Sequence, residues 1–407
     1  MSKAYIAGSG IITATGNNLQ ENLDAFPAGK DGISQPEILQ TNHNLPVGEI
    51  KMTNEMLAQY AVGHFSHAAS PHLLEQLSTW PRTALLSLIA VQEAWVPLAA
   101  KTTGLRIAFI SANTVGGMDL TEHFYAGYKA DADSADLEAV RHHECGAITE
   151  LVADALGLHC WSTTISTACS SSANSIMMGA KLIDQDRYDL VIAGGADSLS
   201  KFTLNGFNSL MILDKEPCRP FDEHRRGLNL GEGAAYLVLA SDKAMAQLEQ
   251  KPGVVVSGYA NANDAHHQTA SSPEGKGNRL AMSEAIRVAG LQPADISYIN
   301  LHGTGTDNND ASEGAAITAL FGDNPPPASS TKAFTGHTLG AAGAVEAVYA
   351  QLCIEGQFVL PHLRLQTPMS SLPWQPVVKM ATQAVNHVLS NSFGFGGNCS
   401  ALVLSKA

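Results

Sequence analysis

The sequence predicts an α/β protein with largely buried sheets. Its length, its composition and the alternation of two kinds of segment point to this class. The chain has 407 residues, which is longer than one hydrophobic core usually supports, so two halves are expected. Apolar runs of strand length alternate with alanine-rich stretches that have helical periodicity. Such runs are typical of strands that helices cover on both faces.

The strand-like and helical segments recur along the whole chain. The strand-like runs are Tyr5–Ala7, Arg106–Ser111, Leu190–Ala193, Ala235–Leu239, Val254–Gly258, Tyr298–Leu301, His387–Ser390 and Ser400–Leu404. The helical stretches are Pro81–Ala94, Ser171–Asp184, Gly277–Ala289 and Gly343–Gln351. The polar, histidine-rich segment Thr41–Trp80 has weak periodicity, which predicts an excursion from the core.

The division into halves is expected within Ala240–Lys251, a charged helical stretch that a Pro-Gly pair follows. We therefore predict an N-terminal half over residues 1–248 and a C-terminal half over residues 249–407. The two halves share a local plan, because a turn with small residues leads into an alanine-rich helix after Cys169 and again after Gly340.

Composition and charge exclude several classes of function. The chain is 45% hydrophobic and 15% charged, as a globular protein is, and its formal charge of -14 argues against binding to nucleic acid or to an anionic membrane surface. No apolar run approaches the length of a membrane span, and the first residues resemble a strand rather than a signal peptide. The six cysteines have no CxxC spacing, so neither a zinc site nor a disulfide framework is indicated. A cytoplasmic location follows.

Cys169 is the candidate nucleophile. It lies between a β-favouring run, Thr163–Thr167, and small residues that suit the start of a helix. The positive end of a helix favours the thiolate, and small neighbours leave room for a thioester. The sequence therefore predicts a lowered pKa and rapid alkylation for this thiol alone. The other five cysteines have no such surroundings and are expected to fill space in the core.

Two histidines lie in glycine-rich turns at the ends of predicted elements. His302 follows a strand-like run and opens His-Gly-Thr-Gly-Thr, and His337 lies in Gly-His-Thr-Leu-Gly-Ala-Ala-Gly, shortly after Lys332. A further turn, Gly-Phe-Gly-Gly, starts at Gly394. Acyl transfer to a thiol needs an activating environment, oxyanion donors and groups that stabilise a second developing charge. These segments and Cys169 together supply such a set.

These motifs resemble those of β-ketoacyl-acyl-carrier-protein synthases of type I/II, the elongating condensing enzymes of the thiolase superfamily. The resemblance runs over most of the chain. It includes Ala193-Gly-Gly-Ala-Asp, Cys218-Arg-Pro-Phe-Asp, Gly231-Glu-Gly-Ala and Asn263-Asp-Ala-His-His-Gln-Thr. It implies a thiolase-like five-layer α-β-α-β-α fold made of two similar halves.

The resemblance also assigns roles to individual residues. Cys169 would take an acyl chain from a carrier-protein thioester, with the backbone amides of Cys169 and Phe395 as the oxyanion hole and Phe395 as a gate. His302 and His337 would stabilise the enolate that forms as malonyl loses carbon dioxide. That carbanion would attack the acyl group and give a 3-oxoacyl product. Lys332 would support the histidines.

A second group of residues is implied to support the site or to contact the substrate. The supporting residues are Glu346, Asp310 and Glu313. The substrate-binding residues are Thr304, Thr306, Thr269, Val115, Phe207 and Phe393, of which the two threonines near His302 bind the phosphopantetheine arm and Val115 limits the depth of the acyl channel. A monovalent cation is implied near Asn300, Glu346, Ser390 and Asn391. No other cofactor is expected, since the substrates are carried on the phosphopantetheine of acyl carrier protein.

Residue types separate this chain from relatives in the same superfamily. Degradative thiolases carry a second cysteine near the site, where this chain has His302 and His337, and initiating synthases carry an asparagine in place of His337. Two functions stay open. One is an active synthase that elongates fatty-acid, polyene or polyketide chains. The other is a largely non-turnover partner subunit of a ketosynthase heterodimer, although such a subunit is expected to lack the nucleophile.

The expected protein partners are acyl carrier protein and either a second copy of this chain or a related ketosynthase-like subunit. A carrier protein is acidic, so the overall negative charge repels it at long range and docking needs a local basic patch. The candidates for this patch are Lys215, Arg219, Arg225 and Arg226. Met211 stands where certain relatives carry an arginine.

Overall fold

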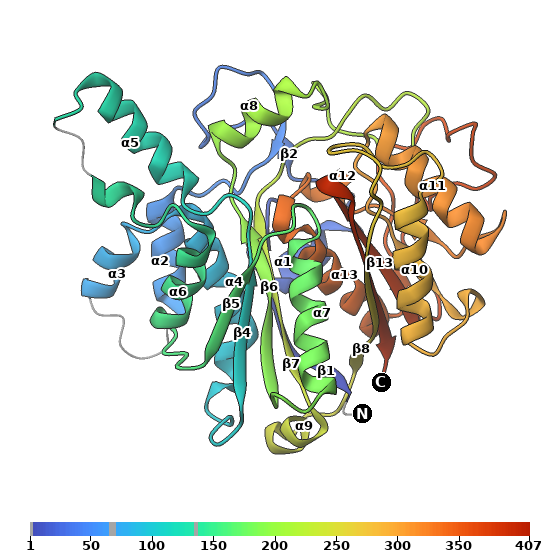
Figure 1. The fold of residues 1–407 in the computed structure, drawn as a ribbon, viewed down its shortest axis with the longest axis horizontal. Coiled ribbons are helices and arrows are strands. Elements are labelled where there is room, and N and C mark those ends of the chain that lie inside the picture. Colours follow the sequence, from blue (N-terminus) through green and yellow to red (C-terminus); the bar gives the residue numbers. More distant parts are fainter. Residues whose placement is uncertain (1–2, 65–70, 134–136) are drawn as a thin grey trace.

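The computed structural model describes residues 3–64, 71–133 and 137–407. Its main strands are β1 (Ala4–Thr13), β4 (Ile107–Ala112), β5 (Trp161–Ile165), β6 (Leu190–Asp197), β7 (Gly233–Ala240), β8 (Val254–Asn263), β9 (Tyr298–Asn300), β10 (Ala328–Ser329), β13 (His387–Gly394) and β14 (Asn398–Lys406). Within the described residues they form one sheet in the order β10-β9-β13-β14-β8-β1-β7-β6-β4-β5 (Figure 1). Each strand-like run predicted from the sequence overlaps one of these strands.

Each half of the sheet repeats the same pattern of pairing. In the first half β7 is antiparallel to β1 and to β6, and the pairs β6–β4 and β4–β5 are parallel. In the second half β14 is antiparallel to β8 and to β13, and the pairs β13–β9 and β9–β10 are parallel. The halves join where Ala4 and Tyr5 of β1 pair with Val256 and Val255 of β8. Two similar halves are therefore confirmed, while the boundary between residues 248 and 249 stays a prediction.

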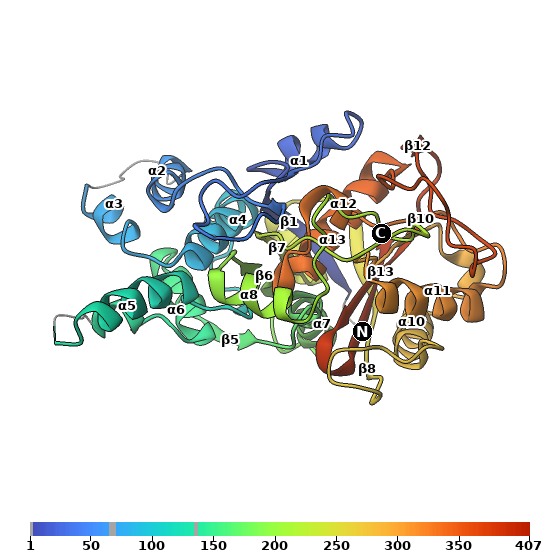
Figure 2. The same ribbon diagram turned by 90° about the horizontal axis from the view of Figure 1, so that it is seen from above.

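Helices complete five layers. The central layer is α7 (Ser171–Asp184) and α13 (Ala342–Gly356), which pack against each other between the two halves of the sheet. The outer face of the first half is covered by α4 (Arg82–Ala99), and that of the second by α10 (Lys276–Val288), with α11 (Asp307–Phe321) beside it (Figures 1 and 2). The predicted α-β-α-β-α order is confirmed.

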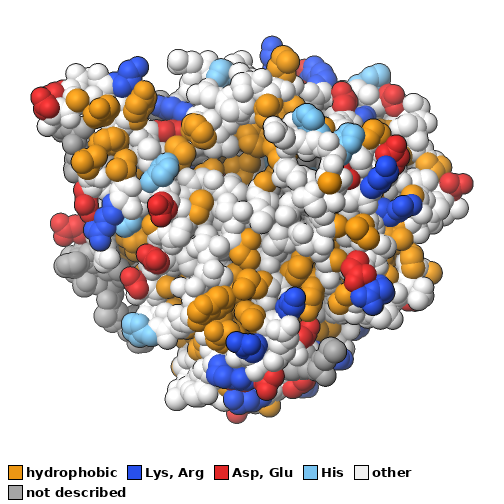
Figure 3. Space-filling model, in the orientation of Figure 1, with side chains coloured by type: hydrophobic (Ala, Val, Ile, Leu, Met, Phe, Trp, Pro, Cys, Tyr) orange, Lys and Arg blue, Asp and Glu red, His pale blue; other side chains and the backbone are white. Residues whose placement is uncertain are grey.

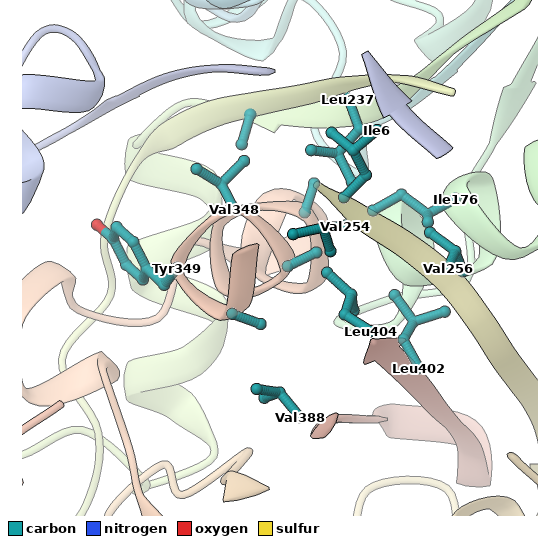
Figure 4. Packing of buried hydrophobic residues seen from close by; sticks show 14 of the residues in the cluster. Ile6, Ile176, Leu237, Val254, Val256, Val348, Tyr349, Val388, Leu402 and Leu404 are labelled. Carbon is teal, nitrogen blue, oxygen red and sulfur yellow. The ribbon is translucent and has the colours of Figure 1, made fainter. Parts of the chain in front are cut away.

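The core is centred on α13. Every residue of this helix from Ala342 to Ala350 is buried, as expected of a helix that is apolar on all sides. Val348 and Tyr349 belong to one cluster with side chains of both half-sheets, such as Leu237 of β7 and Leu404 of β14, and Figure 4 shows Tyr349 on the opposite side of the helix from these two leucines. Glu346 is the charged exception in this buried stretch, so it needs a partner inside the protein.

The remaining elements lie around this centre. The helices are α1 (Leu19–Ala25), α2 (Asn54–His64), α3 (Pro71–Leu77), α5 (Met118–Ala130), α6 (Cys145–Ala155), α8 (Lys201–Ser209), α9 (Asp242–Leu248) and α12 (Lys332–Thr335). Two small sheets pair β2 (Ile33–Ser34) with β3 (Val47–Gly48) and β11 (Phe358–Val359) with β12 (Ala381–Thr382). None of the helices in the described ranges is both long and apolar enough to cross a membrane.

Two peripheral regions differ from the rest. In the segment Thr41–Trp80, predicted to leave the core, residues 65–70 lie outside the described residues. The described part forms α2 and α3, with Leu57, Ala61 and Trp80 buried in the core that includes α4. That prediction is wrong. The buried residues of α2 form only a narrow stripe, and the polar residues around them in the sequence hide its periodicity. By contrast, α5 has no buried residue and lies at one end of the molecule, where exposed hydrophobic side chains gather (Figures 1 and 3).

Candidate active site

Cys169 lies on a tight turn between β5 and α7. The preceding residue, Ala168, has a φ of 53°, a left-handed conformation that side chains other than glycine rarely adopt. The turn is packed against the end of β13. A Cβ on Gly394 would lie 3.2 Å from the backbone nitrogen of Cys169 and from the carbonyl oxygen of Thr167. The glycine therefore lets the Gly-Phe-Gly-Gly turn approach the nucleophile closely.

This approach places two backbone donors at the Cys169 sulfur. The N–H groups of Phe395 and of Cys169 itself both lie within hydrogen-bond reach of Sγ. A carbonyl carbon bonded to that sulfur would hold its oxygen near the same two donors. The thiol, however, is buried, and this burial raises its pKa to about 11, although the charge of Lys332 and the Phe395 N–H act in the opposite direction. The predicted lowering of the pKa is therefore wrong, since loss of water outweighs the charge of Lys332 and the backbone N–H groups.

The pH dependence of Cys169 alkylation should reflect this burial. An ordinary thiol stops gaining reactivity above its pKa of about 8.5, because the thiolate is the reactive form. Cys169 should keep gaining reactivity towards iodoacetamide up to the region of its pKa of about 11. Peptide mapping by mass spectrometry separates Cys169 from the partly exposed Cys145 and Cys160, and Cys169→Ala serves as the control. A plateau at the ordinary thiol pKa would contradict the burial argument.

The two imidazoles lie side by side in the same pocket as the thiol. The rings of His302 and His337 are 5.4 Å apart between centroids and nearly perpendicular, and both side chains are buried with Cys169 in the wall of one cavity. Burial lowers the pKa of both imidazoles well below the ordinary value, and the charge of Lys332 lowers it further. Both rings are therefore neutral at pH 7.

The hydrogen-bond partners fix which nitrogen of each ring carries the proton. Nδ1 of His337 accepts the backbone N–H of Leu339 at 3.1 Å. Nδ1 of His302 lies 3.2 Å from Nζ of Lys332, an ammonium group that can only donate. Each ring thus carries its proton on Nε2. Two neutral N–H donors can stabilise an oxyanion without becoming charged themselves.

Lys332 and Glu346 form a buried ion pair behind the histidines. Nζ of Lys332 donates to Oε1 of Glu346, and both side chains are 2% exposed. Burial raises the pKa of Glu346 to about 7, against the lowering effect of Lys332. Because Lys332 also contacts His302, the pair links the central helix α13 to an imidazole of the site.

Two buried carboxylates shape the turn that begins at His302. Glu313 accepts the backbone N–H groups of His302 and Gly303, each at 2.8 Å. Asp310 accepts those of Thr304 and Gly305 at 3.0 and 3.2 Å. Both residues come from α11 and hold the turn without facing the thiol, so their contacts agree with the supporting positions that the resemblance implied.

Two cavities of about 290 and 400 Å³ meet at Cys169. The first cavity contains both histidines and five of the six predicted substrate residues: Thr269, Thr304, Thr306, Phe207 and Phe393. The second is mainly apolar and contains Val115, Met118, Phe202 and Leu339. Phe207 and Phe395 line both and stack at 5.7 Å between ring centroids. This aromatic pair therefore lies at the junction of the two cavities.

The residues implied for a monovalent cation are only partly brought together. Asn300 and Ser390 are register partners on β9 and β13, on the face towards α13, and Oδ1 of Asn300 and Oε2 of Glu346 are buried without hydrogen bonds. Such oxygens suit a hard cation. The next residue, Asn391, points to the opposite face, where its amide donates to Glu313 at 2.9 Å. The side chains of Asn300, Ser390 and Glu346 thus fit the cation, and that of Asn391 does not.

The predicted basic patch is largely neutralised by neighbouring acids. Arg226 lines the first cavity but pairs with Asp214 and Glu216, and Arg219 also pairs with Glu216. Arg225 is nearly buried beside Asp307 and Asp310. Among the described residues, Lys215 is an exposed candidate with no ion pair.

His362 is a supporting residue that sequence reasoning missed. Its Nε2 donates to the carbonyl of Pro220 at 2.7 Å, and its Nδ1 accepts the N–H of Ser330 at 3.0 Å. Ser330 in turn donates to the carbonyl of Gly303 at 2.6 Å, so His362 helps to fix the turn after His302. A single histidine between apolar residues gives no signal in the sequence.

Comparison with known proteins agrees with this geometry. Residues 1–244 match the N-terminal domain of beta-ketoacyl synthases, and residues 253–366 match their C-terminal domain. The chain belongs to the β-ketoacyl synthase family. The resemblance inferred from the motifs is confirmed. The predicted enzyme class, acyltransferase, is confirmed with it.

The chain is similar to curated synthases with two different names. It is 32% identical over 421 residues to a putative polyketide beta-ketoacyl synthase 1 from Streptomyces cyaneus, covering 99% of this chain and 98% of that one. It is 36% identical over 249 residues to a 3-oxoacyl-[acyl-carrier-protein] synthase 2 from Staphylococcus aureus, covering 59% of this chain and 60% of that one.

Solved structures resemble the synthase over its whole length. The ishigamide ketosynthase/chain length factor has a TM-score of 0.91 at 27% identity and is covered to 99%. A ketosynthase in complex with its chain length factor from Xenorhabdus doucetiae has a TM-score of 0.84 at 30% identity and is covered to 98%. Both matches cover 100% of this chain.

Proposed function

We propose that the chain is an active β-ketoacyl-acyl-carrier-protein synthase. It joins malonyl, with loss of carbon dioxide, to an acyl chain held as a thioester on Cys169. The observation that carries this proposal is the meeting of three elements in one buried pocket: the Cys169 thiol, the N–H groups of Phe395 and Cys169, and the Nε2–H groups of His302 and His337.

The reaction divides into two charge-developing stages. First, the thiol attacks the acyl thioester, its proton passes to the departing carrier thiolate, and the backbone donors stabilise the tetrahedral oxyanion. The malonyl thioester then loses carbon dioxide, and the electron pair of the broken carbon–carbon bond moves to the thioester oxygen, which the two imidazole N–H groups hold. The resulting carbanion attacks the acyl carbonyl, and the Cys169 sulfur leaves as a thiolate, which takes a proton from water.

The alternative function is a largely non-turnover partner subunit. Two of the similar structures are ketosynthases with a chain length factor, so a related chain can serve such a role. We favour the active enzyme because Cys169 and both histidines line the same pocket and Lys332 is in place behind His302.

Intact-mass analysis separates the two functions. Incubation with acyl-carrier protein should add one acyl group to the wild-type chain and none to Cys169→Ala. Addition of malonyl-carrier protein should then restore the unmodified mass and release a 3-oxoacyl product. Stable acylation without product would favour the partner-subunit function, and no acylation at all would contradict the proposal.

The partners proposed for the synthase follow from the same site. Acyl carrier protein would dock at the mouth of the first cavity, which Met211, 88% exposed, lines. The exposed Lys215, four residues later in the chain, would supply the positive charge, since Arg226 is already paired with acids. We also propose a dimer, with a second copy or a related ketosynthase-like subunit, which would cover the exposed α5.

The thiol, amide and imidazole groups match the charges of both stages, so we propose no bound organic cofactor. A monovalent cation held by Asn300, Ser390 and Glu346 would help to neutralise the carboxylate of Glu346, the ion-pair partner of Lys332. The cytoplasmic location stays a prediction.

Val115 should set the longest acyl chain that Cys169 accepts. It lies in the apolar cavity, and Val115→Phe would fill space there. Each buried methylene contributes roughly 0.8 kcal/mol, and overpacking costs typically about 1–3 kcal/mol, so long chains should lose more than the ring restores. Mass spectrometry of Cys169 loading across acyl lengths measures this, with Val115→Ala as the opposite change. An unchanged length profile in Val115→Phe would contradict the assignment.

A further inference from the structure

Asp197 is a buried carboxylate to which no role has been assigned so far. It ends β6, and its side chain is 0% exposed. Its partners among the described residues are hydrogen-bond donors and no cation. Oδ1 accepts the N–H groups of Thr114 and Val115 at 2.8 and 3.1 Å, and Oδ2 accepts the hydroxyl of Thr114 at 2.7 Å and the N–H of Gly340 at 2.6 Å.

The carboxylate holds two different parts of the site. Thr114 and Val115 follow β4 and form part of the wall of the apolar cavity. Gly340 belongs to the short 3-10 turn Leu339–Ala341. A Cβ on Gly340 would lie 2.7 Å from Oδ2 of Asp197, so a glycine is needed for this contact.

The turn at Gly340 is directly connected to the decarboxylating pair. Leu339 lines the apolar cavity, and its N–H is the donor that fixes the tautomer of His337. Leu339 also has a φ of 52°, a strained conformation that its surroundings must hold in place. The path from the cavity wall to His337 therefore runs through Val115, Asp197, Gly340 and Leu339, each in contact with the next.

We propose that Asp197 is a positioning residue that couples the occupant of the acyl cavity to malonyl decarboxylation at His337. An acyl chain that reaches Val115 presses on the segment that Asp197 holds, and the same carboxylate sets the turn that orients His337. Decarboxylation then responds to the length of the chain on Cys169. This inference rests on the proposed function.

The charge of Asp197 gives the coupling a second observable. The carboxylate lies near enough to Cys169 to raise the pKa of the thiol, while Lys332 lowers it. The other ionisable groups in the wall of the pocket are the neutral His302 and His337, together with Arg226 and Asp307. Burial raises the pKa of Asp197 itself to about 6, and its hydrogen bonds counteract this, so it is charged at pH 7. Removal of the charge should lower the pKa of Cys169.

The test uses the full chain with Cys169 alkylated by an N-alkyl iodoacetamide that carries either an ethyl or a dodecyl group. The sulfur displaces iodide and forms a stable thioether, so the cavity is occupied while condensation is blocked. Carbon dioxide release from malonyl-pantetheine is then measured. We expect the rates of carbon dioxide release by the two wild-type adducts to differ by about fivefold, the effect of one hydrogen bond. Asp197→Asn should bring the two rates together and shift the alkylation profile of Cys169 to lower pH.

Two further variants keep the test decisive. Ser175→Ala removes buried hydrogen bonds to Ile110 and Gly194 but leaves the path to His337 intact, so it should preserve the rate ratio and the pH profile. If Asp197→Asn does not fold, Thr114→Val removes one of the four bonds and should reduce the ratio. Equal rates for the wild-type adducts, or an undiminished ratio in a folded Asp197→Asn, would overturn the inference. No decarboxylation by unmodified wild type would contradict the proposed function instead.

Discussion

Replacement of His302 or His337 by alanine should lower malonyl decarboxylation by ~10²–10³-fold, the usual effect of losing one donor to a developing oxyanion. Each ring supplies one Nε2–H, because its Nδ1 is occupied by Lys332 or by the N–H of Leu339. Acyl transfer to Cys169 should continue in both variants, since its oxyanion is held by backbone groups. Carbon dioxide release and intact mass measure the two half-reactions separately.

The state of the imidazoles adds a control to this experiment. His337→Asn keeps an N–H donor near the same place, so it should retain more decarboxylation than His337→Ala. Because burial holds the pKa of both histidines well below the ordinary value, the wild-type rate should not fall as the pH passes through that value. A wild-type decarboxylation rate in either alanine variant would exclude that histidine from the enolate site.

The regular elements were predictable because burial on both faces leaves a strong mark on a sequence. The runs that became β6, β7 and β14 each contain at least four consecutive apolar residues, and the small-residue helices α7 and α13 begin directly after motif turns. The helices that the sequence did not predict include two peripheral ones. In α2 the buried stripe is too narrow to stand out, and α5 buries none of its residues at all.

The site was predictable in its residues and less so in its energetics. Cys169, His302 and His337 were found from motifs, but the raised pKa of the thiol depends on how completely the folded chain excludes water. Arg225 was a docking candidate in the sequence, whereas the fold places it against Asp307 and Asp310. Such pairings join residues far apart in the chain and leave no local pattern. The same holds for the contact between Asp197 and Gly340.

Lys332→Met should show that the buried ion pair has separate structural and catalytic roles. The variant leaves the carboxylate of Glu346 buried without the ammonium group of Lys332. Removal of one partner of a buried ion pair lowers the free energy of unfolding by about 3–5 kcal/mol. Lys332→Met/Glu346→Gln removes both charges and should recover most of that stability. Decarboxylation should stay low in both variants, because neither restores the donor that fixes the tautomer of His302.

The stability loss of Lys332→Met should depend on pH in a definite direction. Burial already raises the pKa of Glu346 from 4.5 to about 7 in the wild type, and loss of the ammonium group raises it further. The folded variant then binds a proton more tightly than the unfolded chain, so it is stable below the unfolded pKa and loses stability as the pH rises through the folded pKa. Urea unfolding at pH 5 and pH 8 should therefore show a Lys332→Met penalty that is about 1.4 kcal/mol larger at the higher pH, because the wild-type carboxyl ionises between the two and that of the variant does not, while the double variant shows little change between them. A Lys332→Met penalty that is equal at both pH values would mean that Glu346 is not the group left uncompensated.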